Sequence, residues 1–433
     1  MRVFAVLCLL VTALLPGSGH AAAPDDDNRI YVVRGGETLY SIAQRYLRHP
    51  QDHERIRKLS RIKTTTAIPI GTRIIIPVRL LRYKPLEARL VSVRGDVTRS
   101  NGAAVREGDI LREGAILRTA ARSFASIRLP DASIISLPSG STVRIARLRQ
   151  YLLGSSYDSA FELVEGGMRS KVTPQRRPQD RFQVRTPASV SAVRGTEFRS
   201  RYESADGRGF TETLEGGVAV TDEAGAIKPQ TVRAGFGLAI AGDGATLSER
   251  LLPAPTLLDP GKPQTLPQLH FRITPVENAA AYHVQIASDA GFIDRIADTR
   301  SETADVQLDG PEDGRYFVRI SAISSAGFEG MPETLGFRRV RNSVKASSSK
   351  DDNGWAFRWL TDSRLPAIYR FQLFAGKPDG TPMVDEAGLR SDQITLSRLD
   401  GGTYFWRVAS TVMADGEAVT QWTDFEKLLV AAE

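Results

Sequence analysis

The hydrophobic positions near the N-terminus follow a helical period over one short stretch. In TLYSIAQRYL, residues 38–47, apolar side chains recur at intervals of three and four. They are Leu39, Ile42, Ala43, Tyr46 and Leu47. This spacing places them on one face of a helix, and Thr38 is of a residue type that caps helix N-termini. The stretch therefore predicts a short amphipathic helix.

Strand patterns flank this helix. IYVV, residues 30–33, is β-branched and aromatic, which favours a strand, and IPIGTRIIIP predicts another from Thr72 to Ile76, ended by Pro77. Between them, DHERIRKLS predicts a second helix that starts at Asp52. The order strand, helix, helix, strand predicts a small βααβ module over residues 29–80.

From residue 83 to 252 the pattern changes to alternation with a period of two. SFASIRL, STVRIARL and RFQV alternate apolar and polar residues, and Gly, Asp and Pro recur between them. Two Glu-Gly-Gly stretches, LVEGGM from Leu163 and TLEGGV from Thr213, are expected to be turns between strands, with glycine at positive φ. The region predicts a curled antiparallel β domain.

The last third of the chain repeats itself. The residues Tyr316, Arg319 and Phe337 recur 88 positions later as Tyr404, Arg407 and Phe425. A period of this length indicates two domains of one kind. Strand alternation in both copies predicts two β-sandwiches, at 255–341 and 350–433, and RNSVKASSSKDDNG between them has the composition of a linker. His270 and His283, beside apolar strand positions, are expected to face solvent.

Residues 1–21 have the three-part pattern of a secretory signal peptide. Arg2 precedes an apolar run from Val3 to Leu15, and Ala21 ends a small-x-small cleavage site. The run is short for a membrane span, and an uncleaved anchor is the alternative. The one cysteine, Cys8, lies within the run, so the mature chain has no thiol for catalysis or metal binding. We expect a product in the periplasm of a Gram-negative cell that is not an integral membrane protein once processed.

The net charge of +7 is unevenly distributed. Residues 29–82 hold twelve Lys and Arg against three Asp and Glu, whereas residues 255–433 hold nineteen against twenty-five. A basic excess can attract nucleic acid, but export favours the polyanionic cell envelope, with a merely solvated surface as the alternative. We expect no nucleic-acid partner.

Three motifs in the first module, YVVRGGETLYSIAQRYL, IRKLSRI and IPIGTRIIIP, stand in the order found in LysM domains. Residues 29–80 resemble this family, and differ from its pattern at Glu37, Ser60 and Ile70, where the family has aspartate, asparagine and proline. The resemblance implies binding of peptidoglycan glycan strands that contain N-acetylglucosamine. The residues expected at the glycan are Gly36, Glu37, Thr38, Leu39, Ser60, Ile62, Ile68, Pro69 and Ile70.

A physical argument accompanies the resemblance. The loops 36–39 and 60–70 should meet at one end of the two-stranded sheet if the helices pack on its face. Backbone amides at a helix start lack partners within the helix, so they could hold the carbonyl of an N-acetyl group. The alternative is that the Gly-Gly-Glu-Thr turn only caps the helix, and that Ile68 and Ile70 are core residues.

The middle region resembles a FecR domain. VREGDILREGAILRTAARSFASIRLPDASIISL and FQVRTPASVSAVRGTEFRSR carry this likeness, and the domain is expected at 83–252. The family is an all-β periplasmic module, best known as the outer half of an anti-sigma regulator. The cytoplasmic helical part and membrane span of that regulator have no counterpart here, so its signalling is not carried over. The two sandwiches resemble fibronectin type III domains, which need no disulfide.

Patterns of catalytic residues are not found. A zinc amidase needs several histidine and carboxylate ligands, and Pro50 separates His49 from His53, which are expected as exposed turn residues. Ser60 and Lys63 fit the S-x-x-K motif without the partner tripeptides that it requires. We expect no enzyme and no cofactor, although paired glycosidase carboxylates could come from any strands.

Together these patterns predict a mainly β, multidomain protein. We expect it to bind peptidoglycan through its first module and to display the other domains as an interaction scaffold for an envelope protein of unknown identity. One alternative is a regulatory protein that acts through FecR-like protein contacts. The other is a peptidoglycan-processing enzyme with unrecognised carboxylates.

Overall fold

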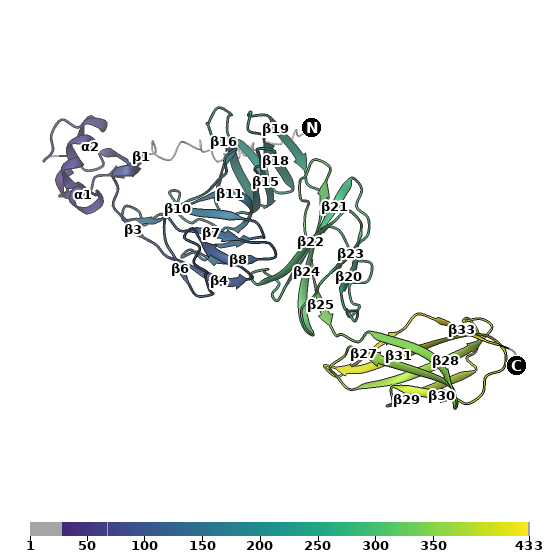
Figure 1. Cartoon of the computed structure of the whole chain (residues 1–433). Helices are drawn as coiled ribbons and strands as arrows, with labels where there is room; N and C mark the ends of the chain where they lie inside the picture. Colours follow the sequence, from purple (N-terminus) through teal and green to yellow (C-terminus); the bar gives the residue numbers. More distant parts are fainter. Residues whose placement is uncertain (1–27, 67, 432–433) are drawn as a thin grey trace, which may run out of the picture.

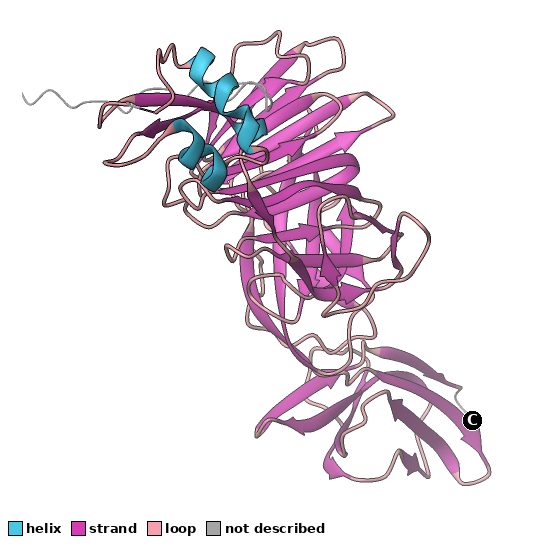
Figure 2. Ribbon diagram, turned by 90° about the vertical axis from the view of Figure 1, so that its left-hand side faces the viewer, coloured by secondary structure: helices cyan, strands magenta, loops and turns pink. Residues whose placement is uncertain are grey.

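The structure is a computed structural model that describes residues 28–66 and 68–431, so the expected signal peptide lies outside the described residues. A small module with helices, a large β domain and two β-sandwiches follow one another along an elongated molecule (Figure 1). Figure 2 shows the helices together at one end and strands elsewhere. The mainly β, multidomain fold class is confirmed.

The first module has the predicted order of elements. They are β1 (Asn28–Val32), α1 (Leu39–Tyr46), the 3-10 turn η1 (Pro50–Asp52), α2 (His53–Leu59) and β2 (Arg73–Pro77). The two strands pair antiparallel, and Ile30 stands opposite Ile75. Leu39 and Ile42 of α1 are buried in one cluster with Ile74 of β2. The periodicity of the sequence located both helices because their apolar stripes meet this cluster.

The core of this module continues into the β domain. Leu81 follows β2, and Tyr151 belongs to the β domain. Both are buried in the same cluster as α1. The guanidinium groups of Arg48 and Arg149 both lie over the ring of Tyr83, at 4.6 and 4.4 Å. Such cation–π contacts and shared burial stabilise a packed joint. The first module therefore packs on its neighbour and is not strung on a loose linker.

The β domain is a continuous curled sheet. It follows the 3-10 turn η2 (Val78–Leu80) and contains β3 (Tyr83–Pro85), β4 (Ala88–Arg94), β5 (Val97–Arg99), β6 (Ile110–Leu111), β7 (Ile116–Thr119), β8 (Phe124–Arg128), β9 (Ile134–Leu137), β10 (Thr142–Tyr151), β11 (Tyr157–Lys171), β12 (Arg181–Arg185), β13 (Ser189–Val193), β14 (Glu197–Glu203), β15 (Arg208–Glu215), β16 (Gly217–Asp222), β17 (Gln230–Arg233), β18 (Phe236–Ile240) and β19 (Thr246–Arg250). Its pairings are antiparallel apart from β11 with β12, which corrects the expectation of a purely antiparallel sheet.

The two Glu-Gly-Gly stretches are corners of this sheet. The first lies inside β11, which pairs with β10 before Gly166 and with β14 from Gly166 onward. The second joins β15 to β16, whose other neighbours differ. Gly166 has φ of 82°, and a Cβ there would collide with the carbonyl oxygen of Gly140. The expected positive φ is found at Gly166 and Gly216, one glycine of each pair. The first stretch redirects β11 and is not the expected turn between strands, whereas the second does connect two strands.

Two sandwiches complete the chain. The first contains β20 (Leu269–Arg272), β21 (Ala279–Ala287), β22 (Arg295–Ser301), β23 (Asp305–Leu308), β24 (Gly314–Ser324) and β25 (Glu333–Arg339). The second contains β26 (Val344–Asp351), β27 (Gly354–Thr361), β28 (Ala367–Ala375), β29 (Val384–Leu389), β30 (Gln393–Leu396), β31 (Gly402–Ala414), β32 (Glu417–Trp422) and β33 (Glu426–Val430). Strand β26 pairs with β27, so the segment with linker composition is a strand of the second sandwich.

Both sandwiches have the sheet pairing of fibronectin type III domains. In the first, β20 pairs with β23, and the other sheet has the order β22-β21-β24-β25. In the second, the sheets are β26-β27-β30 and β29-β28-β31-β32, with β33 also on β31. The alternating apolar residues face the space between the sheets, as Phe371 and Trp406 do in the second sandwich. The repeat in the sequence is therefore a repeat of one fold.

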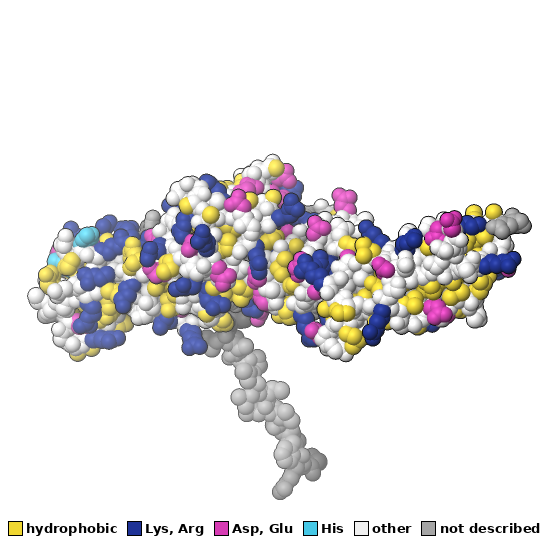
Figure 3. Space-filling view, turned by 60° about the horizontal axis from the view of Figure 1, so that its bottom comes forward, with side chains coloured by type: hydrophobic (Ala, Val, Ile, Leu, Met, Phe, Trp, Pro, Cys, Tyr) yellow, Lys and Arg dark blue, Asp and Glu magenta, His cyan; other side chains and the backbone are white. Residues whose placement is uncertain are grey.

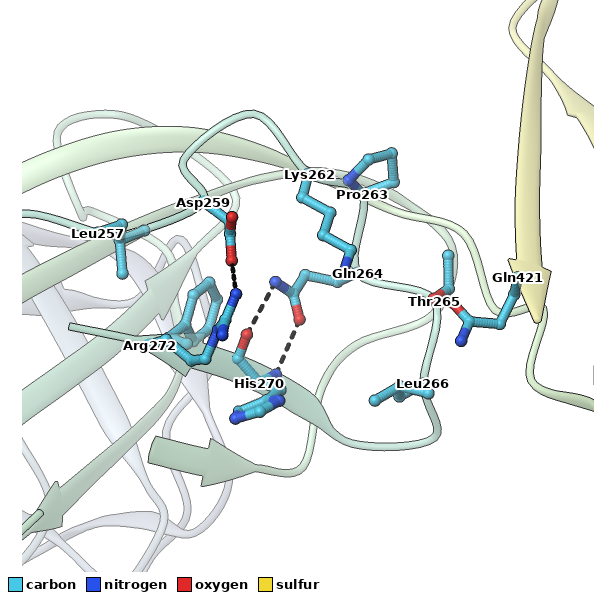
Figure 4. Close-up of a pocket in the computed structure, with 11 residues that line it drawn as sticks. Leu257, Asp259, Lys262, Pro263, Gln264, Thr265, Leu266, His270, Arg272 and Gln421 are labelled. Atoms are coloured by element: carbon cyan, nitrogen blue, oxygen red, sulfur yellow. Dashed lines mark hydrogen bonds and ion pairs between the residues drawn. The ribbon is translucent and has the colours of Figure 1, made fainter. Parts of the chain in front are cut away.

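The two sandwiches are joined by a buried polar contact. Asn342 has no exposed surface, and its side chain donates to the carbonyl oxygens of Ser410 at 2.9 Å and Val419 at 3.1 Å. In addition, Thr265 of the first sandwich donates to Gln421 of the second at 2.7 Å (Figure 4). A buried, fully bonded amide holds its neighbours in one arrangement. The sandwiches are thus fixed against each other.

His283 contradicts its expected position. It is 7% exposed, and its Nδ1 lies 3.1 Å from a carboxylate oxygen of Glu329. The face of the first sandwich that carries His283 packs against the β domain. Alternation along a strand shows which residues face outward from the sandwich, but not whether another domain buries that outer face. His270 is partly buried, with Nε2 2.7 Å from Asp305.

Candidate functional site

The two loops expected at the glycan do adjoin each other. One connects β1 to α1 and the other connects α2 to β2. The backbone N–H of Leu39 donates to the carbonyl oxygen of Thr65 at 3.2 Å. The side chain of Ile70 lies beside Gly35, with its Cδ1 3.6 Å from the place of a Cβ there. The loops therefore form one continuous surface at this end of the module.

The start of α1 does not offer the free amides that the sequence argument assumed. Thr38 and Ser41 form a reciprocal cap, in which the Oγ1 of Thr38 accepts from the N–H of Ser41 at 3.0 Å and the Oγ of Ser41 accepts from the N–H of Thr38 at 2.9 Å. The N–H of Leu39 is used by Thr65. Capping satisfies the donors that a helix start leaves unpaired. An N-acetyl carbonyl would have to find other donors or displace these.

Glu37 braces the first loop. Its carboxylate accepts from the hydroxyl of Tyr31 at 2.7 Å and from the N–H of Arg34 at 2.9 Å, and Arg45 lies 3.5 Å away. Burial by itself would raise the pKa of Glu37, but the hydrogen bonds from Tyr31 and Arg34 lower it below its usual value. The glutamate is thus held ionised, and it shapes the loop from within.

Ser60 has a similar structural role in the second loop. Its Oγ accepts from the N–H of Ile75 at 2.8 Å, which ties the end of α2 to β2. Leu39 and Ile68, both expected at the glycan, are buried in the core of the module. For Ile68 this agrees with the alternative interpretation, in which it is a core residue. Sequence patterns of this kind do not separate residues that shape a groove from residues that line it.

The surface of the site is made by fewer residues than the sequence indicated. Gly36, Pro69 and Ile70 are exposed, and Ile62 is partly buried at the end of α2. Ile70 is 76% exposed, which is unusual for an isoleucine and leaves an apolar side chain available to a ligand. Figure 3 shows Lys and Arg side chains spread over this end of the molecule. The described residues therefore present an exposed apolar side chain, that of Ile70, surrounded by basic side chains.

Elsewhere, the described residues offer no cluster of three His, Asp or Glu side chains that could hold a metal ion. His49 is exposed and His53 partly buried, with the His53 Nδ1 3.0 Å from the carbonyl oxygen of Pro50. A small cavity of about 100 Å³ between the sandwiches is lined by groups that already bond one another, such as Gln264 with the backbone of His270 (Figure 4). Across residues 28–66 and 68–431, no helix is long and apolar enough to cross a membrane.

Comparison with protein families gives two matches. The model of the LysM domain matches residues 31–77, and the model of the FecR protein family matches residues 115–219. The chain carries a LysM domain followed by a FecR domain. Both are binding or signalling kinds of domain that are typical of envelope proteins. No curated protein sequence matches the chain.

Solved structures resemble parts of the chain. One is a putative anti-sigma factor from Parabacteroides distasonis, with 18% identity, a TM-score of 0.26, and coverage of 31% of this chain and 59% of that one. Another is a segment of two fibronectin type III domains from chicken tenascin, with 18% identity, a TM-score of 0.19, and coverage of 40% and 98%. A third comprises fibronectin(III)-like modules from Clostridium thermocellum, with 15% identity, a TM-score of 0.19, and coverage of 41% and 94%.

Proposed function

We propose that this protein binds peptidoglycan glycan strands containing N-acetylglucosamine through its LysM domain and has no catalytic activity. The observation that carries the proposal is the surface where Ile70, Pro69 and Gly36 are exposed together on two adjoining loops of that domain. Sugars bind on such surfaces by apolar contact with a ring face or an acetyl methyl, supported by a few hydrogen bonds. The basic surroundings add attraction to anionic envelope polymers, which salt weakens.

The remaining domains form a scaffold in this proposal. The FecR domain and the two sandwiches are packed on one another through buried contacts, so they present one stiff surface for protein partners. We place the protein in the periplasm, exported by the segment at residues 1–21. A single LysM surface binds weakly, and a second contact with the envelope would raise the overall affinity.

The test is co-sedimentation of the mature chain with insoluble peptidoglycan sacculi. Ile70→Asp should abolish binding that persists at about 1 M salt, where the Debye length is about 3 Å. Ile30→Asp is the matched control, because Ile30 is also exposed, at 54%, but lies on β1 away from the loops. Equal binding by both variants would overturn the proposal. Release of soluble fragments from the sacculi would contradict the absence of catalysis.

A regulatory function is the second candidate, and the match to the FecR family favours it. In that case the main partner is another envelope protein and glycan binding is secondary. A strain whose chain carries Ile70→Asp distinguishes the two candidates. A cellular response that persists after wall binding is lost supports regulation through the FecR domain, and a response that is lost with it supports the anchor.

A further inference from the structure

A cavity of about 400 Å³ lies between the FecR domain and the first sandwich. Its walls come from β11, β14 and β15 on one side and from β21 and β22 on the other. Figure 1 shows this sandwich packed against the large β domain. A cavity of this size between two domains falls in the range that accommodates small-molecule ligands.

Arginine dominates the charged groups that line this cavity. The arginines are Arg169, Arg199, Arg201, Arg295 and Arg300. Three carboxylates, Glu212, Asp298 and Glu329, face them. The lining residues alone carry an excess of two positive charges, and Glu197 and Glu203, outside the lining, pair with Arg169 and Arg201. Positive charge enclosed by low-dielectric walls attracts anions more strongly than the same charge in water does.

Several of these arginines are already paired. Arg199 contacts Glu212 at 2.9 Å and Glu329 at 2.5 Å, which closes the wall between the two domains. Arg169 pairs with Glu197 at 2.7 Å, a carboxylate outside the cavity lining. These pairs hold the walls in place and use up the acidic side chains. Arg201 pairs with Glu203 and Arg300 is exposed, which leaves one buried arginine to account for.

Arg295 is that remaining arginine. It is 4% exposed, and its Nε and Nη1 have no hydrogen-bond partner among the described residues. The carboxylate of Asp298 is 3.9 Å from Nη1, too far for a hydrogen bond. The ring of Phe124 lies 5.5 Å from Cζ of Arg295 but offers no carboxylate or carbonyl oxygen. Two buried guanidinium nitrogens without hydrogen bonds are disfavoured unless something completes them.

A neighbouring arginine strengthens the positive field. Arg319 is buried on the adjacent strand β24, lies 3.8 Å from the ring centre of Phe292, and has an Nη1 without a hydrogen-bond partner among the described residues. Burial lowers the pKa of Arg319, and the nearby Arg169 and Arg295 lower it further. With Arg319 included, and with Glu197 and Glu203 counted beside the three lining carboxylates, six arginines face five carboxylates around this cavity.

We propose that this cavity binds a small oxyanion, with Arg295 as the direct donor. The ligand carries a carboxylate or a phosphate group, since a guanidinium fork binds either with two parallel hydrogen bonds. It would contact both domains, and would stabilise the joint between them. This site is separate from the LysM surface, so the inference does not rest on the proposed function.

The test is calorimetric titration of the mature chain with acetate and, separately, with inorganic phosphate, at an ionic strength held constant with chloride. We expect saturable binding of one of them with a dissociation constant of about 1 mM or tighter. Preference for acetate identifies a carboxylate ligand, and preference for phosphate identifies a phosphorylated one. Either preference supports the site, whereas no saturable binding of either anion overturns it.

Variants assign the site to its residues. Arg295→Gln should weaken binding about tenfold or more, because it removes charge-assisted hydrogen bonds, and Arg295→Lys, which keeps the charge but loses the planar fork, should weaken it less. Arg315→Gln is the matched control, because Arg315 lies in the same sandwich but is exposed and pairs with Asp415. Arg295→Lys keeps the test valid should Arg295→Gln fail to fold. Unchanged affinity in a folded Arg295→Gln chain, or equal weakening by Arg315→Gln, would refute the assignment.

Discussion

Arg94 of the β domain and Asp294 of the first sandwich form a two-point ion pair across the joint between their domains. The Nε of Arg94 lies 2.7 Å from Oδ1 of Asp294, and Nη2 lies 2.6 Å from Oδ2. The same carboxylate accepts from the hydroxyl of Ser92 at 2.9 Å and from that of Ser288 at 2.8 Å. One carboxylate therefore joins β4 to the loop between β21 and β22.

Asp294→Asn should loosen this joint. The amide cannot accept all four hydrogen bonds, and we expect a loss of about 1–2 kcal/mol in the free energy of unfolding, reduced by the partial exposure of Arg94. Asp385→Asn is the matched control, since Asp385 makes the same two-point pair with Arg370 inside the second sandwich. Limited proteolysis between the FecR domain and the first sandwich should accelerate in Asp294→Asn alone. Equal cleavage in both variants would show that the pair does not secure the joint.

Acid should weaken the joint over a defined range. The hydrogen bonds from Arg94 lower the pKa of Asp294 to about 2, against an ordinary value of 3.8. Because the folded-state pKa is the lower one, the stabilisation is complete above about pH 4 and is lost as the pH falls toward 2. The difference in unfolding midpoint between the wild type and Asp294→Asn should therefore shrink over this range. A difference that stays constant down to pH 2 would contradict the assignment.

His283 should make the opposite contribution. Burial by itself would lower the pKa of His283, but the carboxylates of Glu329 and Asp298 raise it above the usual 6.5. A raised pKa gives stabilisation that is complete below about pH 6.5 and is lost as the pH rises through the folded-state value. Unfolding of the wild type and His283→Gln, measured from about pH 6 to 9, should converge as the pH rises. A difference between the two chains that stays constant from about pH 6 to 9 would contradict this assignment.

Tyr151→Ala should destabilise a domain to which Tyr151 does not belong in sequence. Tyr151 is buried in the core of the LysM domain, and its hydroxyl donates to Asp158 at 3.0 Å. Removing a buried aromatic ring costs about 3 kcal/mol or more. We expect an early unfolding transition of the LysM domain and weaker binding to sacculi. Tyr40→Ala, at an exposed position of α1, should leave both unchanged, and an unaltered transition in Tyr151→Ala would contradict the shared core.

Local patterns predicted the LysM domain well for a physical reason. The stripe of Leu39, Ile42 and Ala43 meets a core formed within about fifty residues of chain, so its periodicity contains most of the information needed. The cap at Thr38 was predicted on the same basis. The loss of free amides at the start of α1 was not predicted. The partner of the Leu39 N–H is Thr65, which is distant in the sequence although its loop lies alongside.

The repeat of 88 residues shows where sequence reasoning reached its limit. Arg319 and Arg407 occupy equivalent positions, and both stack on aromatic rings, Arg319 on Phe292 and Arg407 on Trp422. The strands that carry these two arginines, β24 and β31, have the same alternation of apolar and polar residues. The FecR domain nevertheless covers the outer face of the first sandwich. His283 and the cavity around Arg295 became buried through this long-range packing, which no period along a strand encodes.

The buried amide of Asn342, the shared core around Tyr151 and the pair of Arg94 with Asp294 have a mechanical consequence when taken together. Each of these contacts restricts the relative motion of two neighbouring domains at one junction. If the first domain binds the wall as proposed, the molecule would behave as a rigid rod and not as a flexible tether, so it would resist compression as well as extension. Whatever docks on the last sandwich would be kept at one set distance from the glycan layer.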